Sequence, residues 1–158
     1  MSFFDYPNES PAPGGNVDTL LADATEDEWA MLLGHTRYRR FGPGDVVVTA
    51  GAWEQSLYLV LEGQLDVLAE HGRRKYRKIA SVSAGSVIGE LSFFDGGARS
   101  AMVRAVTPAV LAEMSPAEFD ALAAANPVLA RRLLFDLGRI LAQRLRAAQQ
   151  ANSVAGVN

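Results

Sequence analysis

The sequence feature that most constrains this fold is the texture of residues 38–114. Short runs rich in valine, leucine and isoleucine are interrupted by glycine, proline or aspartate, at intervals of about ten residues, the spacing of small all-β domains. Strands of this length separated by turns predict an antiparallel roll or barrel. By alternation along each strand, Leu65, Val67 and the residues of 79–82 are expected to line its interior.

A short helix is predicted before this region. Thr25 followed three residues later by Glu28 fits a capping box, in which each side chain bonds the backbone of the other residue. Trp29, Leu32 and Leu33 then form the apolar side of the helix.

Two helices are predicted after it. Ser115-Pro116 with Glu118, and then Asn126-Pro127, each combine a capping side chain with proline at the first helical position. The second helix is expected to run to about Gln150, a length of roughly 36 Å at ~1.5 Å per residue. Its apolar positions form two stripes. The first is expected to pack on the roll: Leu129, Leu133, Leu137 and Ile140.

The second stripe of this helix is a seam with a spacing near seven: Leu134, Leu141, Leu145 and Ala148. A helix on a small domain needs one buried face, and this helix offers nearly two. The second face is explained either by deeper burial, under a preceding helix folded over it, or by pairing with its twin in a homodimer. We favour the homodimer.

Residues 89–101, GELSFFDGGARSA, combine groups that suit a small phosphorylated sugar. Backbone N–H groups at the start of the turn after Glu90 are expected to point at an anion, as at helix N-termini. Arg99 would add a two-pronged, permanently charged contact to phosphate oxygens. An ionised Glu90 only accepts hydrogen bonds, so it suits a sugar hydroxyl better than the phosphate.

This segment closely resembles the phosphate-binding cassette of the cyclic-nucleotide-binding domain family, found in bacterial catabolite activators and in cyclic-nucleotide-gated channels and kinases. The resemblance rests on Gly-Glu-Leu-Ser at one end, Arg-Ser-Ala at the other, and the interval between them. It extends to residues 41–48, similar to the first hairpin of the family, to 57–63, its next strand and turn, and to 85–88, the approach to the cassette. It thus runs from Asp18 to Gln150.

The resemblance implies an α+β, mainly β fold: a jelly-roll-like antiparallel β-roll of about eight strands, with a short N-terminal helix, a cassette helix and two C-terminal helices. We predict a flexible lead-in over residues 1–16, where residues 8–15 are rich in proline, glycine and serine. The cyclic-nucleotide-binding domain is expected over 17–150 and a frayed tail over 151–158.

The implied regulatory ligand is cAMP or cGMP, with no cofactor and no metal. The expected ligand-binding residues are Ile88, Gly89, Glu90, Leu91, Ser92, Arg99, Ser100, Ala101 and Arg144. Arg99 and Ser100, with N–H groups near Leu91, Ser92 and Ala101, would hold the phosphate, while Glu90 would accept from the ribose 2′-hydroxyl. Ile88 would contact sugar and base.

The match to the family weakens at the base. Bacterial activators place a hydroxyl residue on the long helix there, whereas this chain has residues 143–146, QRLR. Arg144 is the candidate to stack over the purine, with a solvated helix arginine as the alternative. Because Ser100 suits a guanine edge as well as a phosphate, the choice between cAMP and cGMP stays open.

Composition narrows the function classes. The 158 residues carry a formal net charge of −3, which argues against a general nucleic-acid binder. The chain has no cysteine, so disulfides and thiolate metal sites are excluded. The N-terminus lacks the basic residues followed by an apolar run that mark a signal peptide, and no stretch reaches the ~20 apolar residues of a membrane span. We therefore expect a cytoplasmic protein without membrane or nucleic-acid partners.

Three other functions remain as alternatives to a cyclic-nucleotide sensor. A cupin-type enzyme would need clustered ligands, but the two histidines, His35 and His71, lie far apart. An interaction module of the same fold could bind a different anion, such as a cyclic dinucleotide, or no nucleotide. The basic run of residues 73–78 could dock an acidic partner or a phosphate backbone, although a solvated hairpin tip explains it more simply.

The constellation holds no catalytic group, so the sequence predicts a sensor and not an enzyme. Ligand binding would draw the cassette and the long helix together. About thirty residues follow Pro127, all used by the helix and tail, which leaves no room for a helix-turn-helix. The output is therefore expected to pass through homodimerisation by the C-terminal helix or through an unidentified effector protein.

Overall fold

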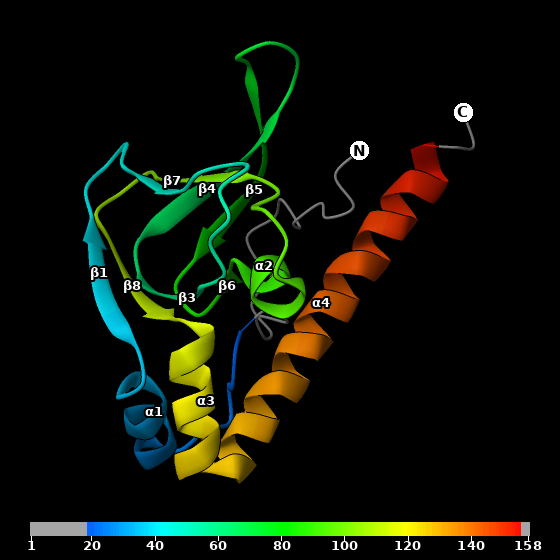
Figure 1. Ribbon diagram of the computed structural model, residues 1–158. Coiled ribbons are helices and arrows are strands. Elements are labelled where there is room, and N and C mark those ends of the chain that lie inside the picture. The colour runs from blue at the N-terminus through cyan, green and yellow to red at the C-terminus, as the bar shows by residue number, and fades with distance from the viewer. Residues whose placement is uncertain (1–18, 156–158) are drawn as a thin grey trace.

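Two four-stranded antiparallel sheets face each other to form a β-roll within residues 19–155, the part of the chain that this computed structural model describes (Figure 1). One sheet has the strand order β1-β8-β3-β6 and the other β2-β7-β4-β5. The strands are β1 (Arg37–Phe41), β2 (Val46–Val48), β3 (Leu57–Glu62), β4 (Gln64–Glu70), β5 (Tyr76–Ser83), β6 (Val87–Ile88), β7 (Met102–Ala105) and β8 (Ala109–Met114). The predicted roll of about eight strands is confirmed.

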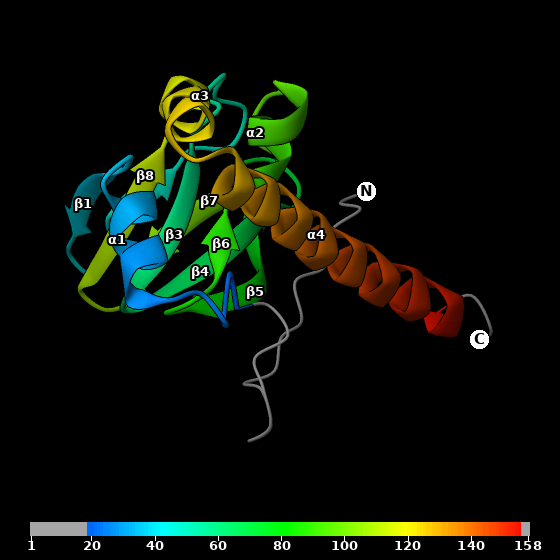
Figure 2. The ribbon, with the colours of Figure 1, turned by 90° about the horizontal axis from the view of Figure 1, so that it is seen from below.

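Four helices accompany the roll within the described residues: α1 (Glu26–Leu33), α2 (Glu90–Asp95), α3 (Pro116–Ala125) and α4 (Pro127–Ala155). Capping boxes open α1 and α3, as the sequence predicts. The Asn126 side chain accepts from the N–H of Leu129 at 3.1 Å and caps α4. Figures 1 and 2 show α1, α3 and the first part of α4 at one end of the roll, with the rest of α4 reaching beyond it.

The core has two parts. Between the sheets lie alternating residues of the strands, including the predicted Leu65 and Val67, both at most 1% exposed. A second cluster joins one sheet to the helices and contains the whole predicted first stripe of α4: Leu129, Leu133, Leu137 and Ile140. Burial of this stripe fixes α4 on the roll because each such side chain contributes about 1.5–3 kcal/mol when removed from water.

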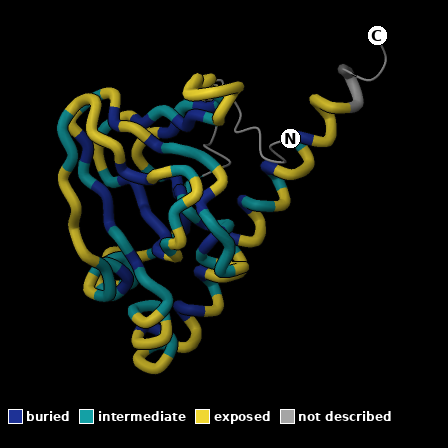
Figure 3. The backbone as a smooth tube through the Cα atoms, turned by 45° about the horizontal axis from the view of Figure 1, so that its top comes forward, coloured by how far each residue is buried: buried dark blue, intermediate teal, exposed yellow. Residues whose placement is uncertain are grey.

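The second stripe of α4 is only partly covered. Leu134 and Leu145 are 38% and 39% exposed, whereas Ala148 is buried. In Figure 3 buried and exposed residues alternate along α4, as expected for a helix with one face on the domain. Leu134 and Leu145 thus leave an apolar edge on the outer side of the helix.

Two details differ from expectation. β1 and β2 are not paired as a hairpin, because β1 pairs with β8 and β2 with β7, in different sheets. The turn between them, in which Asp45 accepts from the Gly42 N–H at 2.7 Å, carries the chain from one sheet to the other. In addition, α4 continues five residues past Gln150, to Ala155, because no glycine or proline stands between Gln150 and Gly156.

The predicted lead-in of residues 1–16 lies outside the described residues, as do residues 156–158 of the predicted tail. The basic run of residues 73–78 lies in the β4–β5 hairpin, which projects from the roll in Figure 1, and all six of its residues are exposed. No helix in the described part of the chain is long and apolar enough to cross a membrane.

Candidate functional site

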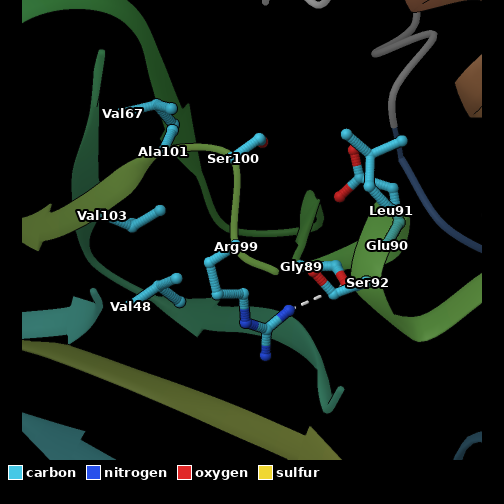
Figure 4. A pocket seen from close by; sticks show the side chains of 10 residues that line it. All are labelled: Val48, Val67, Gly89, Glu90, Leu91, Ser92, Arg99, Ser100, Ala101 and Val103. Carbon is cyan, nitrogen blue, oxygen red and sulfur yellow. Dashed lines mark hydrogen bonds between the residues drawn. The ribbon is translucent and has the colours of Figure 1, made fainter. Parts of the chain in front are cut away.

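A pocket lies between α2, the segment that follows it, and the inner face of the roll. It is lined by Val48, Val67, Gly89, Glu90, Leu91, Ser92, Arg99, Ser100, Ala101 and Val103. Figure 4 shows the valines and Ala101 on one side, and Glu90, Leu91 and Ser92 of α2 on the other. The pocket therefore has an apolar wall facing a polar one.

Seven of the nine predicted site residues line this pocket: Gly89, Glu90, Leu91, Ser92, Arg99, Ser100 and Ala101. Ile88 is fully buried in the core between the sheets, and it is not among the lining residues. Conversely, Val48 and Val103 were not singled out from the sequence. For Val103 the alternation with the exposed Arg104 on β7 was the available signal, whereas Val48 follows the buried Val47 and no such alternation marks it.

Arg99 is held firmly at the pocket. Its Nη1 donates to the carbonyl of Gly89 at 3.0 Å and its Nη2 to that of Ser56 at 2.6 Å. The residue is 4% exposed, and its Nε is buried with no hydrogen-bond partner among the described residues. A guanidinium has five N–H donors, so after these two bonds several N–H groups remain that can donate to an anion.

Gly89 makes the close approach of Arg99 possible. It caps α2 in the left-handed conformation, with φ of 79°, which side chains other than glycine rarely adopt. A Cβ atom at this position would lie 2.6 Å from Nη1 of Arg99 and 2.8 Å from the carbonyl oxygen of Ser56. Both the backbone and the packing therefore require glycine here.

Glu90 is ion-paired with Arg144 of α4, and both residues are 1% exposed. Arg144 Nη1 donates to Glu90 Oε1 at 2.7 Å, and its Nη2 donates to the carbonyl of Val87 at 3.1 Å. This geometry differs from the predicted stacking of Arg144 over a base and from the solvated alternative. The pair instead ties the cassette to the long helix.

Tyr58 connects the site to the sheet beneath it. Its hydroxyl donates to Glu54 Oε1 at 2.5 Å, and the Arg99 guanidinium lies 5.8 Å from the centre of its ring. Burial, and secondly the hydrogen bond to Glu54, raise the pKa of Tyr58 well above its ordinary value of 10.0. The hydroxyl therefore stays protonated and keeps donating to the carboxylate.

This raised pKa predicts a stability change in alkaline solution. Above pH 10 the unfolded chain releases the Tyr58 proton while the folded protein retains it, so the free energy of unfolding falls as the pH rises. The fall is up to about 1.4 kcal/mol for each pH unit. Urea unfolding of the wild type and of Tyr58→Phe between neutral and alkaline pH measures it. A wild-type pH dependence equal to that of Tyr58→Phe would contradict the assignment.

Metal ligation has no support in the described residues, where no group of three or more His, Cys, Asp or Glu side chains is placed to hold an ion. His35 Nδ1 lies 2.9 Å from the carbonyl of Met31, and His71 is exposed on the β4–β5 hairpin.

Known proteins similar to this chain identify its family. The family model of the cyclic nucleotide-binding domain matches residues 38–126. The cAMP-activated global transcriptional regulator CRP of Salmonella typhimurium is 31% identical over 115 residues, which cover 72% of this chain and 54% of that protein. Glutaminase 2 of Bradyrhizobium diazoefficiens is 33% identical over 129 residues, 82% of this chain but 20% of that protein.

A solved structure shows the same fold. The Thermus thermophilus catabolite activator protein superposes with a TM-score of 0.75 at 27% identity, over 85% of this chain and 62% of its own. The chain thus spans about half of the regulator and a fifth of the glutaminase. Its roll, its cassette and the family match together show that this chain belongs to the cyclic nucleotide-binding domain family, whose members are regulatory domains.

Proposed function

We propose that this domain is a sensor that binds cAMP or cGMP in the pocket beside α2, and that α4 passes the signal to a second copy or to a separate effector protein. The observation that carries the proposal is the placement of Glu90 and Arg99 on one pocket, opposite an apolar wall of the roll. The proposal includes no catalytic step.

Each part of a cyclic nucleotide meets a suitable group in this arrangement. The single negative charge of the phosphodiester would be met by Arg99, which is nearly fully buried and charged at all physiological pH values. Ser100 and the N–H groups in the first turn of α2 would complete the phosphate contacts. The valine wall would cover sugar and base, and Glu90 would accept from the ribose hydroxyl.

The buried pair of Glu90 and Arg144 supports a signalling route. A ribose hydroxyl that bonds Glu90 changes the balance of contacts that hold Arg144, and Arg144 lies on α4. The position of α4 would then depend on whether the pocket is filled. The shift can be no larger than the preference of the ligand for one helix position over the other.

Calorimetric titration with cAMP, cGMP and cyclic di-GMP tests the function. We expect saturable binding of at least one cyclic mononucleotide, and weaker binding of its 2′-deoxy analogue by roughly 10-fold to 150-fold, because a hydrogen bond to a charged group contributes about 1.5–3 kcal/mol. Binding of cyclic di-GMP alone, or no heat and no thermal shift with any ligand, would instead support the interaction module. Equal affinity for the 2′-deoxy analogue would refute the role of Glu90.

The exposed edge of α4 supports homodimerisation as the second part of the proposal. Leu134, Gly138, Leu141 and Leu145 follow the four-three spacing of a coiled-coil seam. A Cβ atom added at Gly138 would meet nothing within 4 Å, so a second helix has room to approach.

We expect Leu145→Glu to shift the protein from dimer to monomer in sedimentation equilibrium, because it places a charge on each side of the paired seam. Gln150→Glu is the matched control, since Gln150 is exposed and lies away from the seam. A wild type that is monomeric throughout the tested concentrations would refute homodimerisation. Signalling to a separate effector protein would then be the proposed output.

A further inference from the structure

Arg99, the cation of the pocket, already has an anionic neighbour in Glu54. Arg99 Nη2 lies 3.6 Å from Glu54 Oε1, within ion-pair distance. Glu54 is in the loop between β2 and β3 and does not line the pocket itself. The Arg99 side chain is 2% exposed and that of Glu54 is 40% exposed, so the pair lies at the boundary between the protein interior and solvent.

Glu54 is held in place by the fold. The Tyr58 hydroxyl donates to Glu54 Oε1 at 2.5 Å, and Tyr58 itself is 2% exposed in the core. The backbone of the same loop is bonded to Arg99: the Gly51 N–H donates to the Arg99 carbonyl at 2.9 Å, and the Arg99 N–H donates to the Ala52 carbonyl at 2.8 Å. The carboxylate and the guanidinium are therefore kept at a fixed separation.

The neighbouring carboxylates are engaged with cations of their own. Glu90 pairs with Arg144 at 2.7 Å, and Glu113 pairs with Arg39 at 2.8 Å. At Arg99, the charge of Glu54 opposes that of the guanidinium. A bound phosphate is therefore attracted by Arg99 and repelled by Glu54 a few ångströms further away, and each added negative charge on the ligand increases that repulsion.

We propose that Glu54 is a positioning residue that sets the charge selectivity of the pocket, favouring the singly charged cyclic phosphodiester over the doubly charged phosphomonoester. The inference rests on the proposed function and goes beyond it. A cyclic phosphodiester carries one negative charge, whereas a phosphomonoester carries about −1.5 to −2 at pH 7. Glu54 thereby lets the pocket distinguish a cyclic nucleotide from its linear hydrolysis product, which keeps the same base and sugar.

The test compares the affinities of cAMP and 5′-AMP, by calorimetry near pH 8, for the wild type and for Glu54→Gln. We expect Glu54→Gln to bind both ligands more tightly and to lose about tenfold of the preference for cAMP, the size expected of a partly solvated pair of unit charges. In the wild type this preference should shrink with added salt, which screens the exposed carboxylate. Glu54→Gln should show little dependence of the preference on salt.

Glu62→Gln is the matched control, because it makes the same change of charge at an exposed position at the end of β3. Tyr58→Phe keeps the Glu54 charge and removes its hydrogen bond, so it should lower the preference only in part. Thermal melts without ligand confirm that each variant folds.

The outcomes separate the two claims. If the wild type binds cAMP and the preference is unchanged in Glu54→Gln, the role of Glu54 is wrong and the proposed function stands. If the wild type binds cGMP and not cAMP, the same comparison is made between cGMP and 5′-GMP. If the wild type binds no cyclic mononucleotide, the proposed function is wrong and the role of Glu54 falls with it.

Discussion

We expect Arg99→Gln to lower the affinity for the cyclic nucleotide by roughly 30-fold to several thousand-fold. This range corresponds to the loss of about 2–5 kcal/mol when one half of a buried charge pair is removed. The buried position of Arg99, at 4% exposure, is the reason for the size of the effect, because the phosphate would be left without a compensating charge in a partly closed pocket. Isothermal titration calorimetry measures it.

Arg99 also stabilises the cassette, so the variant needs controls. Its bonds to the carbonyls of Gly89 and Ser56 are lost in Arg99→Gln, and the thermal melt of the ligand-free variant reports that cost. Arg104→Gln is the matched control, since Arg104 is exposed on β7, next to the pocket-lining Val103 and on the other face of the strand. A folded Arg99→Gln that binds as tightly as Arg104→Gln would show that the phosphate is held elsewhere.

The second large effect concerns the stability of the fold. We expect Arg144→Met to lower the free energy of unfolding by about 3–5 kcal/mol, because it leaves the Glu90 carboxylate buried without the guanidinium that now faces it. Urea unfolding at neutral pH measures the change. Arg146→Met, two residues further along α4 and exposed, is the matched control, and we expect a change within about 0.5 kcal/mol for it.

A double-mutant cycle isolates the contact between the cassette and α4. Glu90→Gln with Arg144→Met should cost less than the sum of the two single changes, with a coupling of up to about 3 kcal/mol. Additive costs would mean that the two side chains do not stabilise each other. The proposed route from pocket to α4 would then lose its physical basis.

Local signals made the helices predictable. The residues that cap α1 and α3 are close in sequence to the backbone groups that they bond, so Thr25 with Glu28 and Ser115 with Glu118 could be identified directly. The apolar stripe from Leu129 to Ile140 could be predicted equally well, since its spacing defines one helix face. The end of α4 was placed too early because helix ends depend on weaker signals than helix starts with a capping box.

Contacts distant in sequence were less predictable. Strand alternation predicted a roll, but the assignment of β1 to the sheet of β8 depends on pairing across about seventy residues, for example Arg37 with Glu113. Likewise, the sequence placed an arginine on the long helix near the cassette. That Arg144 pairs with Glu90, 54 residues away, follows from how α4 lies against α2.

The site was predicted by residue type more than by geometry. The charge of Arg99 indicated an anion site and the carboxylate of Glu90 a site for a sugar hydroxyl, and both residues line the pocket. The partners that hold Arg99, namely two backbone carbonyls and Glu54, carry no sequence signal of their own. Gly89 belongs to the cassette, but Ser56 and Glu54 come from a loop about forty residues earlier in the chain, and the fold alone brings them to Arg99.

The most direct test of the central claim is a crystal structure of this chain with the cyclic mononucleotide that binds best. The account predicts that the phosphate lies within hydrogen-bond distance of the Arg99 guanidinium, with the ribose hydroxyl on Glu90 and the base toward the roll and α4. A nucleotide bound outside this pocket, or one whose phosphate makes no contact with Arg99, would contradict it.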